Sequence, residues 1–253
     1  MFDEPDEFAG QVAVVTGGSR GIGAGVAIAL AGLGARVVVG GRDRAALAKV
    51  VETITRAGGL AHAVAGDLTI EDDARALRNQ AEQVYGPVSL LAACAGGGGE
   101  AKPLAQESLA HWRATLDANL TSAFLTLRAF VPPMMAAGRG AVVTLSSSAG
   151  RQLSGASAPY AAAKAGLQSL TRQAADEAAP HGVRINAIAP SAIVTDRLAA
   201  APEAVRARIA AGFPLGRIGE VGDVSDAALF LLSRRSAWIT GVVLDVAGGR
   251  VMV

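Results

Sequence analysis

The chain has 253 residues, of which 51% are hydrophobic and 18% are charged, and its formal net charge is +1. This length is enough for one globular domain with a full core, and the basic residues are scattered rather than gathered in a stripe, which argues against a nucleic-acid-binding protein. One cysteine and three isolated histidines exclude an internal disulfide framework and give no metal-ligand spacing, so we expect no metal and a cytoplasmic location.

The first ten residues carry four acidic side chains, where a secretory signal would need a positive region followed by an apolar one. We expect residues 1–10 to be a short flexible lead-in and residues 11–253 to form one domain. The apolar runs that follow are short and are broken by Arg36, Arg42 and many glycines. They predict buried strands and helices rather than membrane spans.

Seven short apolar runs predict strands, at residues 12–16, 36–39, 61–65, 88–93, 141–145, 183–188 and 242–246. Between the first four lie helix-length stretches with apolar residues three and four apart, at residues 22–33, 44–57 and 71–85, each followed by glycine. Alternating strands and helices require right-handed crossovers, and strands that are apolar throughout are typical of a sheet covered on both faces. The sequence predicts an α/β fold, a doubly wound parallel sheet of seven strands with helices on both faces.

Two segments interrupt this alternation. Four glycines at residues 96–99 predict a mobile loop after the fourth strand. Residues 191–219, with Pro202 and Pro214, form a long excursion before the last helix. Excursions of that length are often functional, so we expect a substrate lid.

A glycine-rich turn follows the first strand directly and opens the first helix. It reads Thr16-Gly17-Gly18-Ser19-Arg20-Gly21-Ile22-Gly23. Backbone N–H groups at a helix N-terminus attract a pyrophosphate, and glycine lets the backbone come close to it. This context predicts a dinucleotide site in which Gly17, Gly21 and Gly23 matter most. The alternative is a tight turn without a ligand.

The end of the second strand, Val39-Gly40-Gly41-Arg42-Asp43, bears on the choice of cofactor. An NAD-dependent enzyme usually has a carboxylate there, whereas NADP needs positive charge. Gly41 stands at the expected carboxylate position, and Arg42 and Arg20 are candidates for binding a 2′-phosphate. The sequence favours NADP(H), with NAD(H) still possible. The alternative is that Arg42 is a solvated charge and Asp43 a helix cap.

Tyr160 and Lys164 stand four residues apart, on one face of a helix that Ser157 would cap and Pro159 would begin. A free phenol has a pKa near ~10, and a neighbouring ammonium favours the phenolate. We therefore expect Lys164 to lower the pKa of Tyr160 and make it a general acid or base. The alternative is an aromatic and a lysine without a shared role.

From Gln11 to Gly249 the chain resembles the short-chain dehydrogenase/reductase family, whose Rossmann fold consists of one domain. The resemblance rests on the glycine-rich turn, the Tyr160-x-x-x-Lys164 pair, Ser147 thirteen residues before the tyrosine, and Asn119 further back. It implies that Ser147 binds the substrate carbonyl, Tyr160 donates its proton, Lys164 also holds the nicotinamide ribose, and Asn119 supports a water relay. From the residues alone, Ser147 could instead form a local turn and Asn119 a helix kink.

The same resemblance extends the cofactor site. Asp67 matches an adenine-binding aspartate, with a helix cap as the ordinary alternative, and residues 190–195 match a segment that meets the nicotinamide amide. The implied cofactor-binding residues are Gly17, Ser19, Arg20, Gly21, Ile22, Gly23, Arg42, Asp67, Leu68, Ala95, Gly96, Asn119, Tyr160, Lys164, Pro190, Ile193 and Thr195.

Two positions depart from the family pattern. Ala93-Cys94-Ala95-Gly96 stands where the family usually has Asn-Asn-Ala-Gly, which removes two bracing amides, and Ser191 replaces the glycine after Pro190. We expect Cys94 to fill space as a small hydrophobe. Neither departure changes a predicted catalytic side chain.

These observations favour an NADP(H)-dependent carbonyl reductase or alcohol dehydrogenase acting on a small molecule. The alternatives are a 3-oxoacyl-acyl-carrier-protein reductase and a dinucleotide-binding regulator without catalysis. We expect residues 97–102, 151–153 and 196–215 to surround the substrate, with Leu153, Leu198 and Phe213 giving a partly apolar pocket. The apolar helical stretches 109–137 and 159–179 look too extensive for a monomer, and the family resemblance suggests a homotetramer.

Overall fold

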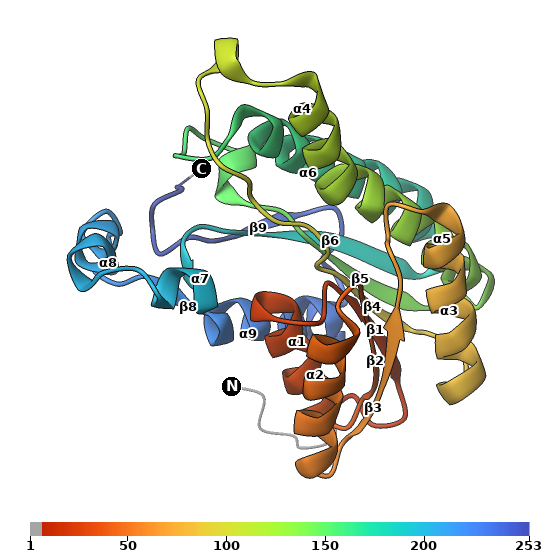
Figure 1. Ribbon diagram of the computed structural model, residues 1–253. Helices are drawn as coiled ribbons and strands as arrows, with labels where there is room; N and C mark the ends of the chain where they lie inside the picture. Colours follow the sequence, from red (N-terminus) through yellow and green to blue (C-terminus); the bar gives the residue numbers. More distant parts are fainter. Residues whose placement is uncertain (1–6, 253) are drawn as a thin grey trace.

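A seven-stranded parallel sheet forms the centre of the protein, as the computed structural model shows for residues 7–252 (Figure 1). The strand order is β3-β2-β1-β4-β5-β6-β9, and every neighbouring pair is parallel. The strands are β1 (Val12–Thr16), β2 (Arg36–Gly41), β3 (Leu60–Ala65), β4 (Leu90–Ala93), β5 (Gly140–Leu145), β6 (Val183–Pro190) and β9 (Val243–Val246). The predicted fold class is confirmed.

Helices cover both faces of this sheet (Figure 1). Alternate residues of β1 show why: Ala13 and Val15 pack with α1, α2 and α9, whereas Val12 and Val14 pack with α3, α5 and α6. The helices are α1 (Gly21–Gly32), α2 (Arg44–Arg56), α3 (Glu71–Tyr85), α4 (Leu109–Leu116), α5 (Ser122–Ala136), α6 (Ala158–Ala178), α7 (Asp196–Ala199), α8 (Glu203–Ala210) and α9 (Val221–Leu232). The two buried layers account for strands that are apolar throughout.

The strand order reverses between β1 and β4. The chain moves outward from β1 to β3 and then returns to place β4 on the other side of β1. Crossovers leave in opposite directions there, so a crevice opens at the carboxyl ends of these two strands. The predicted glycine-rich turn and the loop after β4 both lie at this point.

The N-terminal lead-in is only partly described, because residues 1–6 lie outside the described range. Residues 7–10 form a turn, and Phe8 is fully buried, with its N–H donating to Leu33 O at 2.9 Å. This part of the lead-in packs against the fold, contrary to the expectation of flexibility, because Phe8 completes the core around α1 and α2.

The predicted lid contains regular structure of its own. Two short strands, β7 (Ile193–Val194) and β8 (Gly219–Glu220), pair in parallel where the excursion leaves and rejoins the body. Between them lie α7 and α8, and α8 stands away from the sheet (Figure 1). No residue of α8 is buried, so this helix depends little on the core.

Candidate active site

The glycine-rich turn lies at the carboxyl end of β1 and leads into α1. Gly17 has φ +62°, and a Cβ there would lie 2.7 Å from the carbonyl oxygen of Cys94. A Cβ on Gly23 would lie 2.3 Å from Gly17 O, so the turn and the helix pack backbone to backbone. Both positions therefore need glycine. The turn presents backbone rather than side chains at the N-terminus of α1, which suits a phosphate group.

The segment after β6 meets this turn. Pro190 is buried at the end of β6, and Ile193 is buried in β7. Thr195 lies at the N-cap of α7, and a Cβ on Gly21 would be 3.3 Å from Thr195 Cγ2. The structure thus brings Gly21 and Thr195 together although they are far apart in sequence.

At the end of β2, Arg20 forms an ion pair instead of being left open to a 2′-phosphate as expected. Arg20 pairs with Asp43, and Asp43 also accepts from Ala46 N at 3.0 Å as the N-cap of α2. The helix-cap alternative for Asp43 is therefore confirmed, and Arg20 is already engaged by a carboxylate. Arg42 remains exposed beside Asp67, whose pKa its charge helps to lower.

Asp67 does not cap α3, because that helix begins at Glu71 with Ile70 as its N-cap. Instead, Asp67 accepts from Thr69 N at 3.0 Å and from Thr69 Oγ1 at 2.8 Å, which closes a local turn. These hydrogen bonds are the main reason that the pKa of Asp67 is lowered. The next predicted residue, Leu68, is buried in the core.

Asn119 lies in a π-helical turn, Asp117–Thr121, between α4 and α5. Its buried Nδ2 donates to Thr115 O at 2.9 Å and to Gly97 O at 3.0 Å, and its Oδ1 accepts from Gly97 N at 3.0 Å. The residue therefore satisfies a carbonyl in the widened helix and also fixes the loop after β4. The Asn119 side chain therefore both stabilises the irregular helical turn and contacts the loop at the candidate site.

Gly96 separates Asn119 from Lys164. It has φ +137°, and a Cβ there would lie 2.5 Å from Asn119 Oδ1 and 3.4 Å from Lys164 Nζ. Lys164 is almost completely buried on α6 and donates from Nζ to Leu145 O at 2.7 Å. Burial lowers the pKa of Lys164 to about 8, and the nearby Cys94 opposes this shift.

Ser147 follows β5 and begins a one-turn 3-10 helix, Ser148–Gly150. Its Oγ accepts from Ala149 N at 3.2 Å, so the local-turn alternative is confirmed. Hydrogen bonding from the nearby Ser147 side chain also acts on Tyr160, where it lowers the pKa of the phenol. The neighbouring Ser146 instead donates to Lys164 O at 3.0 Å, which distinguishes the roles of these two serines.

The pKa of Tyr160 is raised above its ordinary value, chiefly by burial, and the hydrogen bond from Ser147 opposes this. The expectation that Lys164 makes this phenol acidic is therefore wrong for the structure as it stands. Lys164 Nζ lies 5.6 Å from the centroid of the Tyr160 ring and donates to a backbone carbonyl. Loss of hydration raises the pKa of the phenol, and the group that opposes this is Ser147 rather than Lys164.

The start of α6 also differs in detail. Ser157 is at the N-cap as predicted, but its side chain makes no capping hydrogen bond, and its buried Oγ has no partner among the described residues. Pro159 is the second helical residue rather than the first.

Gln168, a residue that sequence reasoning did not single out, braces the serine segment. Its Nε2 donates to Ser146 Oγ at 3.0 Å and to Ser147 O at 3.2 Å. It follows Lys164 by one helical turn, so the same i, i+4 pattern that linked Tyr160 and Lys164 would have found it.

The predicted substrate residues are held by the C-terminal turn. Arg151 Nε lies 3.2 Å from Asp245 Oδ2, and Gln152 Nε2 donates to Arg250 O at 3.2 Å, whereas Leu153 is 98% exposed. Phe213 is buried, with the Arg250 guanidinium 5.4 Å from its ring centroid. The predicted lid and the loop after Ser147 therefore both contact residues 245–250.

Residues 17–250 match a family model described as Enoyl-(Acyl carrier protein) reductase. The chain belongs to the short-chain dehydrogenase/reductase family. It is 39% identical over 244 residues to cis-4-hydroxycyclohexanecarboxylate dehydrogenase from Sinomonas cyclohexanicum, covering 96% of this chain and 98% of that protein. It is 37% identical over 248 residues to 2,3-dihydroxy-2,3-dihydro-p-cumate dehydrogenase from Pseudomonas putida, covering 96% and 95%.

A solved structure agrees along nearly the whole chain. A 3-oxoacyl-[acyl-carrier protein] reductase with bound NAD from Brucella melitensis superposes with a TM-score of 0.91 at 32% identity, covering 99% of this chain and 95% of that one. Members of the short-chain dehydrogenase/reductase family are oxidoreductases that use NAD(H) or NADP(H), and the crevice described above fits such a cofactor. The fit rests on glycines whose Cβ atoms would collide with the backbone, at Gly17 and Gly23, and with Asn119, at Gly96.

A hydrogen bond braces the sheet beside Cys94. Thr16 Oγ1 accepts from Ala95 N at 3.2 Å and so joins the ends of β1 and β4. Burial raises the pKa of Cys94 to about 12, against the opposing charge of Lys164. The thiol is therefore protonated at neutral pH and is a poor nucleophile.

Two further observations apply to residues 7–252. No helix in this range is long and apolar enough to cross a membrane. Within it, no three or more His, Cys, Asp or Glu side chains are grouped so as to hold a metal ion.

Proposed function

We propose that the protein is an NADP(H)-dependent oxidoreductase that interconverts a carbonyl group and a secondary alcohol, with Tyr160 as general acid and base. The observation that carries this proposal is the convergence of four side chains, Asn119, Ser147, Tyr160 and Lys164, around the loop after β4. They lie at the crevice where the glycine-rich turn is ready to hold a pyrophosphate.

The side chains divide the work by their chemistry. The raised pKa keeps Tyr160 protonated at neutral pH, so its hydroxyl is ready to donate to a substrate carbonyl oxygen. Ser147, already hydrogen-bonded to Tyr160, supplies a second donor to the same oxygen. The bound cofactor supplies or accepts the hydride.

Lys164 and Asn119 position this pair. Lys164 is held against Leu145 O, at the end of the strand that leads to Ser147. Asn119 fixes the backbone of Gly97 next to it. We assign them as the residues that order the nicotinamide side of the site and relay the proton to solvent, as the family resemblance implies.

Arg42 is the side chain that favours NADP(H). It is exposed at the end of β2, and none of the ion pairs between described residues involves it, whereas Arg20 is held by Asp43. In Arg42→Asp, the ratio of kcat/KM for NADP to that for NAD should fall at least ~10-fold, because a charged hydrogen bond is worth ~1.5–3 kcal/mol. Arg56→Asp, exposed at the far end of α2, is the matched control. An unchanged ratio would show that Arg42 does not select between NADP and NAD.

The substrate class is proposed from the relatives. Two of them are named as dehydrogenases of ring-bearing alcohols, a hydroxycyclohexanecarboxylate and a dihydrodiol of p-cumate. We therefore favour a cyclic secondary alcohol or its ketone. The second candidate is a 3-oxoacyl thioester, which the likeness to the Brucella reductase supports.

A cofactor-oxidation screen tests the proposal. Cyclic ketones, quinones, sugars and 3-oxoacyl thioesters would each be incubated with NADPH and with NADH, using wild type and Tyr160→Phe. We expect turnover of a cyclic ketone, and a loss of ~10²–10⁴-fold in kcat in Tyr160→Phe with cofactor binding retained. Cofactor binding without turnover of any substrate, equal in both proteins, would favour a non-catalytic dinucleotide-binding regulator.

We further propose a cytoplasmic homotetramer in which residues 191–219 cover the bound substrate. The assembly is supported by β9, the last strand of the sheet, whose four residues are all half-exposed. Sheet edges of this kind are usually covered.

A further inference from the structure

A second cavity lies at the opposite edge of the sheet from the crevice. Its volume is about 1380 Å³, and it is lined by residues at the amino ends of β1, β4, β5 and β6 and by the turn after α9. The glycine-rich turn and Tyr160 are at the carboxyl ends of the strands and are not part of its lining. The site proposed for redox chemistry therefore does not account for this cavity.

Positive charge gathers in this cavity from distant parts of the sequence. The basic side chains that line it are Arg139, Arg184, Arg234 and Arg235, and the acidic side chain among the lining residues is Glu7. The arginines are scattered along the chain, and the fold brings them together between the end of α5 and the turn after α9. An anion would meet an excess of positive charge here.

Arg184 has a structural role that shapes the cavity. Its guanidinium donates to Leu231 O at 2.9 Å, Ser236 Oγ at 2.8 Å and Ser233 O at 2.8 Å. These hydrogen bonds fix the turn that follows α9. The turn then holds Arg234 and Trp238 at the cavity.

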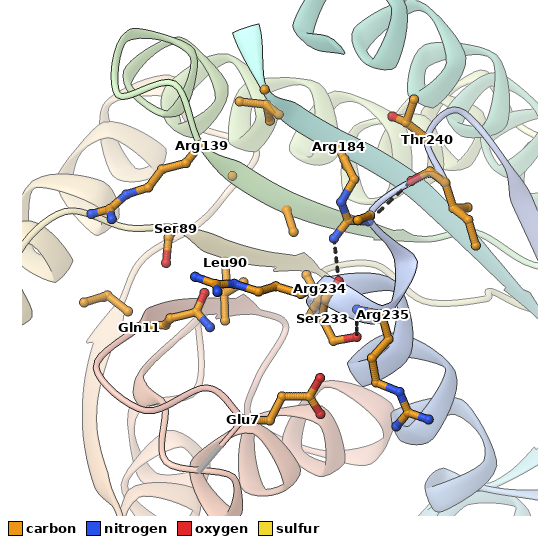
Figure 2. A pocket seen from close by; sticks show the side chains of 18 of the residues that line it. Glu7, Gln11, Ser89, Leu90, Arg139, Arg184, Ser233, Arg234, Arg235 and Thr240 are labelled. Atoms are coloured by element: carbon orange, nitrogen blue, oxygen red, sulfur yellow. Dashed lines mark hydrogen bonds between the residues drawn. The ribbon is translucent and has the colours of Figure 1, made fainter. Parts of the chain in front are cut away.

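Arg139 and Arg234 are the arginines available to a ligand. Among residues 7–252, no ion pair that we observe engages either of them. Figure 2 shows the Arg234 side chain extending toward Gln11, whereas the Arg139 side chain runs past Ser89 and points away from Arg234. Ser89 and Gln11 add an uncharged hydroxyl and an amide to the lining. Guanidinium groups with such neighbours suit phosphate, because each can form two parallel hydrogen bonds to its oxygens.

Trp238 adds an aromatic surface to the same cavity. It is 100% exposed, the highest value among the large hydrophobic side chains of the described chain. A fully hydrated indole lacks the stabilisation that burial of its apolar surface would give. Its flat face is well suited to stack against a second ring. The cavity thus combines guanidinium groups for a polyanion with an aromatic group for a planar base.

We propose that this amino-edge cavity binds a nucleoside polyphosphate, with Arg139 and Arg234 holding the phosphates and Trp238 stacking on the base. Its volume exceeds the ~300–1,000 Å³ of typical small-molecule sites, so a nucleotide fits. This binding is independent of the proposed oxidoreductase activity, since no lining residue belongs to the candidate active site.

The two tryptophans of the chain permit a direct test. Trp112→Phe leaves Trp238 as the sole tryptophan, and Trp238→Phe leaves Trp112 on α4. Each full-length variant would be titrated with GTP and with inorganic tripolyphosphate, in the presence of saturating NADP⁺ and NAD⁺. GTP is chosen because its base differs from the adenine of the cofactors.

We expect GTP to quench the fluorescence of Trp112→Phe saturably and to leave that of Trp238→Phe unchanged. Adding Arg139→Gln or Arg234→Gln to Trp112→Phe should raise the apparent Kd for GTP ~10-fold, since each change removes a charged hydrogen bond. Adding Arg75→Gln, a charge change on α3, should have no effect. Tripolyphosphate should bind more weakly than GTP, because it cannot stack.

Three results would overturn the proposal. The first is no quenching of Trp238 by millimolar GTP, and the second is quenching that both arginine variants leave unchanged. The third is equal affinity for tripolyphosphate, which would show that the base is not recognised. None of these results bears on the redox activity, which the cofactor-oxidation screen measures separately.

Discussion

The protonation of Tyr160 is the residue-level property with the clearest consequence. Burial raises its pKa, so the phenol is the main form at neutral pH and the phenolate grows as pH rises. Reduction of a carbonyl needs the phenol, whereas oxidation of an alcohol needs the phenolate. We expect kcat/KM for oxidation to rise with pH beyond neutrality, and kcat/KM for reduction to be level there and to fall at higher pH. Steady-state pH profiles in both directions measure this.

Ser147 provides the control for that assignment. Its hydrogen bond lowers the pKa of Tyr160, so in Ser147→Ala the pKa should move further up. The rising limb of the oxidation profile should shift to higher pH, in addition to a loss of rate. A limb that moves to lower pH, or stays in place, would assign it to another group, and Lys164, with its pKa of about 8, would be the first to examine.

Gly96 gives a second prediction at this scale. Gly96→Ala would place a Cβ 2.5 Å from Asn119 Oδ1 at a backbone φ of +137°. We expect a loss of stability of ~1–3 kcal/mol and a fall in kcat, because the backbone is strained for alanine and Asn119 must move. Gly98→Ala, with no atom within 4 Å of the added Cβ, is the matched control. Equal effects of both changes on kcat would contradict the close approach.

Single residues also show where sequence reasoning succeeds. The thirteen-residue offset selected Ser147, whose side chain is close enough to Tyr160 to lower its pKa. It could not give the sign of the phenol's pKa shift, because that depends on burial by the tertiary fold. The role of Arg20 was missed for a similar reason, since its partner Asp43 comes close only when β1 and β2 align.

At the level of elements, strands and helices of the sheet follow from hydrophobic pattern and glycine positions, with ends that differ by a few residues. The strand β4, for example, begins at Leu90 rather than Val88. The segment predicted to be a lid, residues 191–219, has no such pattern. Its helix α8 buries no residue, and its strands β7 and β8 have two residues each. None of these three elements produces a periodic hydrophobic pattern in the sequence.

Asp223 gives the prediction for this scale, because it anchors the place where the lid rejoins the body. Its carboxylate binds Arg217 at 2.6 and 2.7 Å and accepts from Glu220 N at 2.7 Å in a capping box at the start of α9. Asp223→Asn should lower the free energy of unfolding by ~1 kcal/mol and the Tm by ~2–4 °C. Asp226→Asn, exposed on the same helix, should change the Tm little.

The same contact has a pH dependence of known sign. Arg217 holds the pKa of Asp223 at about 2, below its usual value of 3.8. The stabilisation is therefore complete above pH 4 and is lost as pH falls toward 2. The Tm difference between wild type and Asp223→Asn should shrink over that range. A difference that stays constant down to pH 2 would show that the ion pair contributes nothing.

The two proposed functions lie at opposite edges of one sheet. The carboxyl edge collects the glycine-rich turn and the proposed catalytic side chains, which motif spacing made visible. The amino edge collects the arginines of the second cavity, which sequence reasoning treated as scattered charge. Spacing along the chain identifies residues on one element, whereas a cluster drawn from four strand ends and a distant turn appears only when the strand order is known.

Assembly is the remaining property at this scale. Phe124 is 44% exposed on α5, within the helical stretch whose apolar character suggested a tetramer, and Ile28 is 40% exposed on α1. If α5 packs against a second copy, Phe124→Glu places a charge in an apolar interface, while Ile28→Glu places it in water. We expect light scattering to give four times the chain mass of 25.4 kDa for wild type and Ile28→Glu, and a smaller particle for Phe124→Glu. A monomeric wild type, or a tetramer in all three proteins, would show that this face is not the interface.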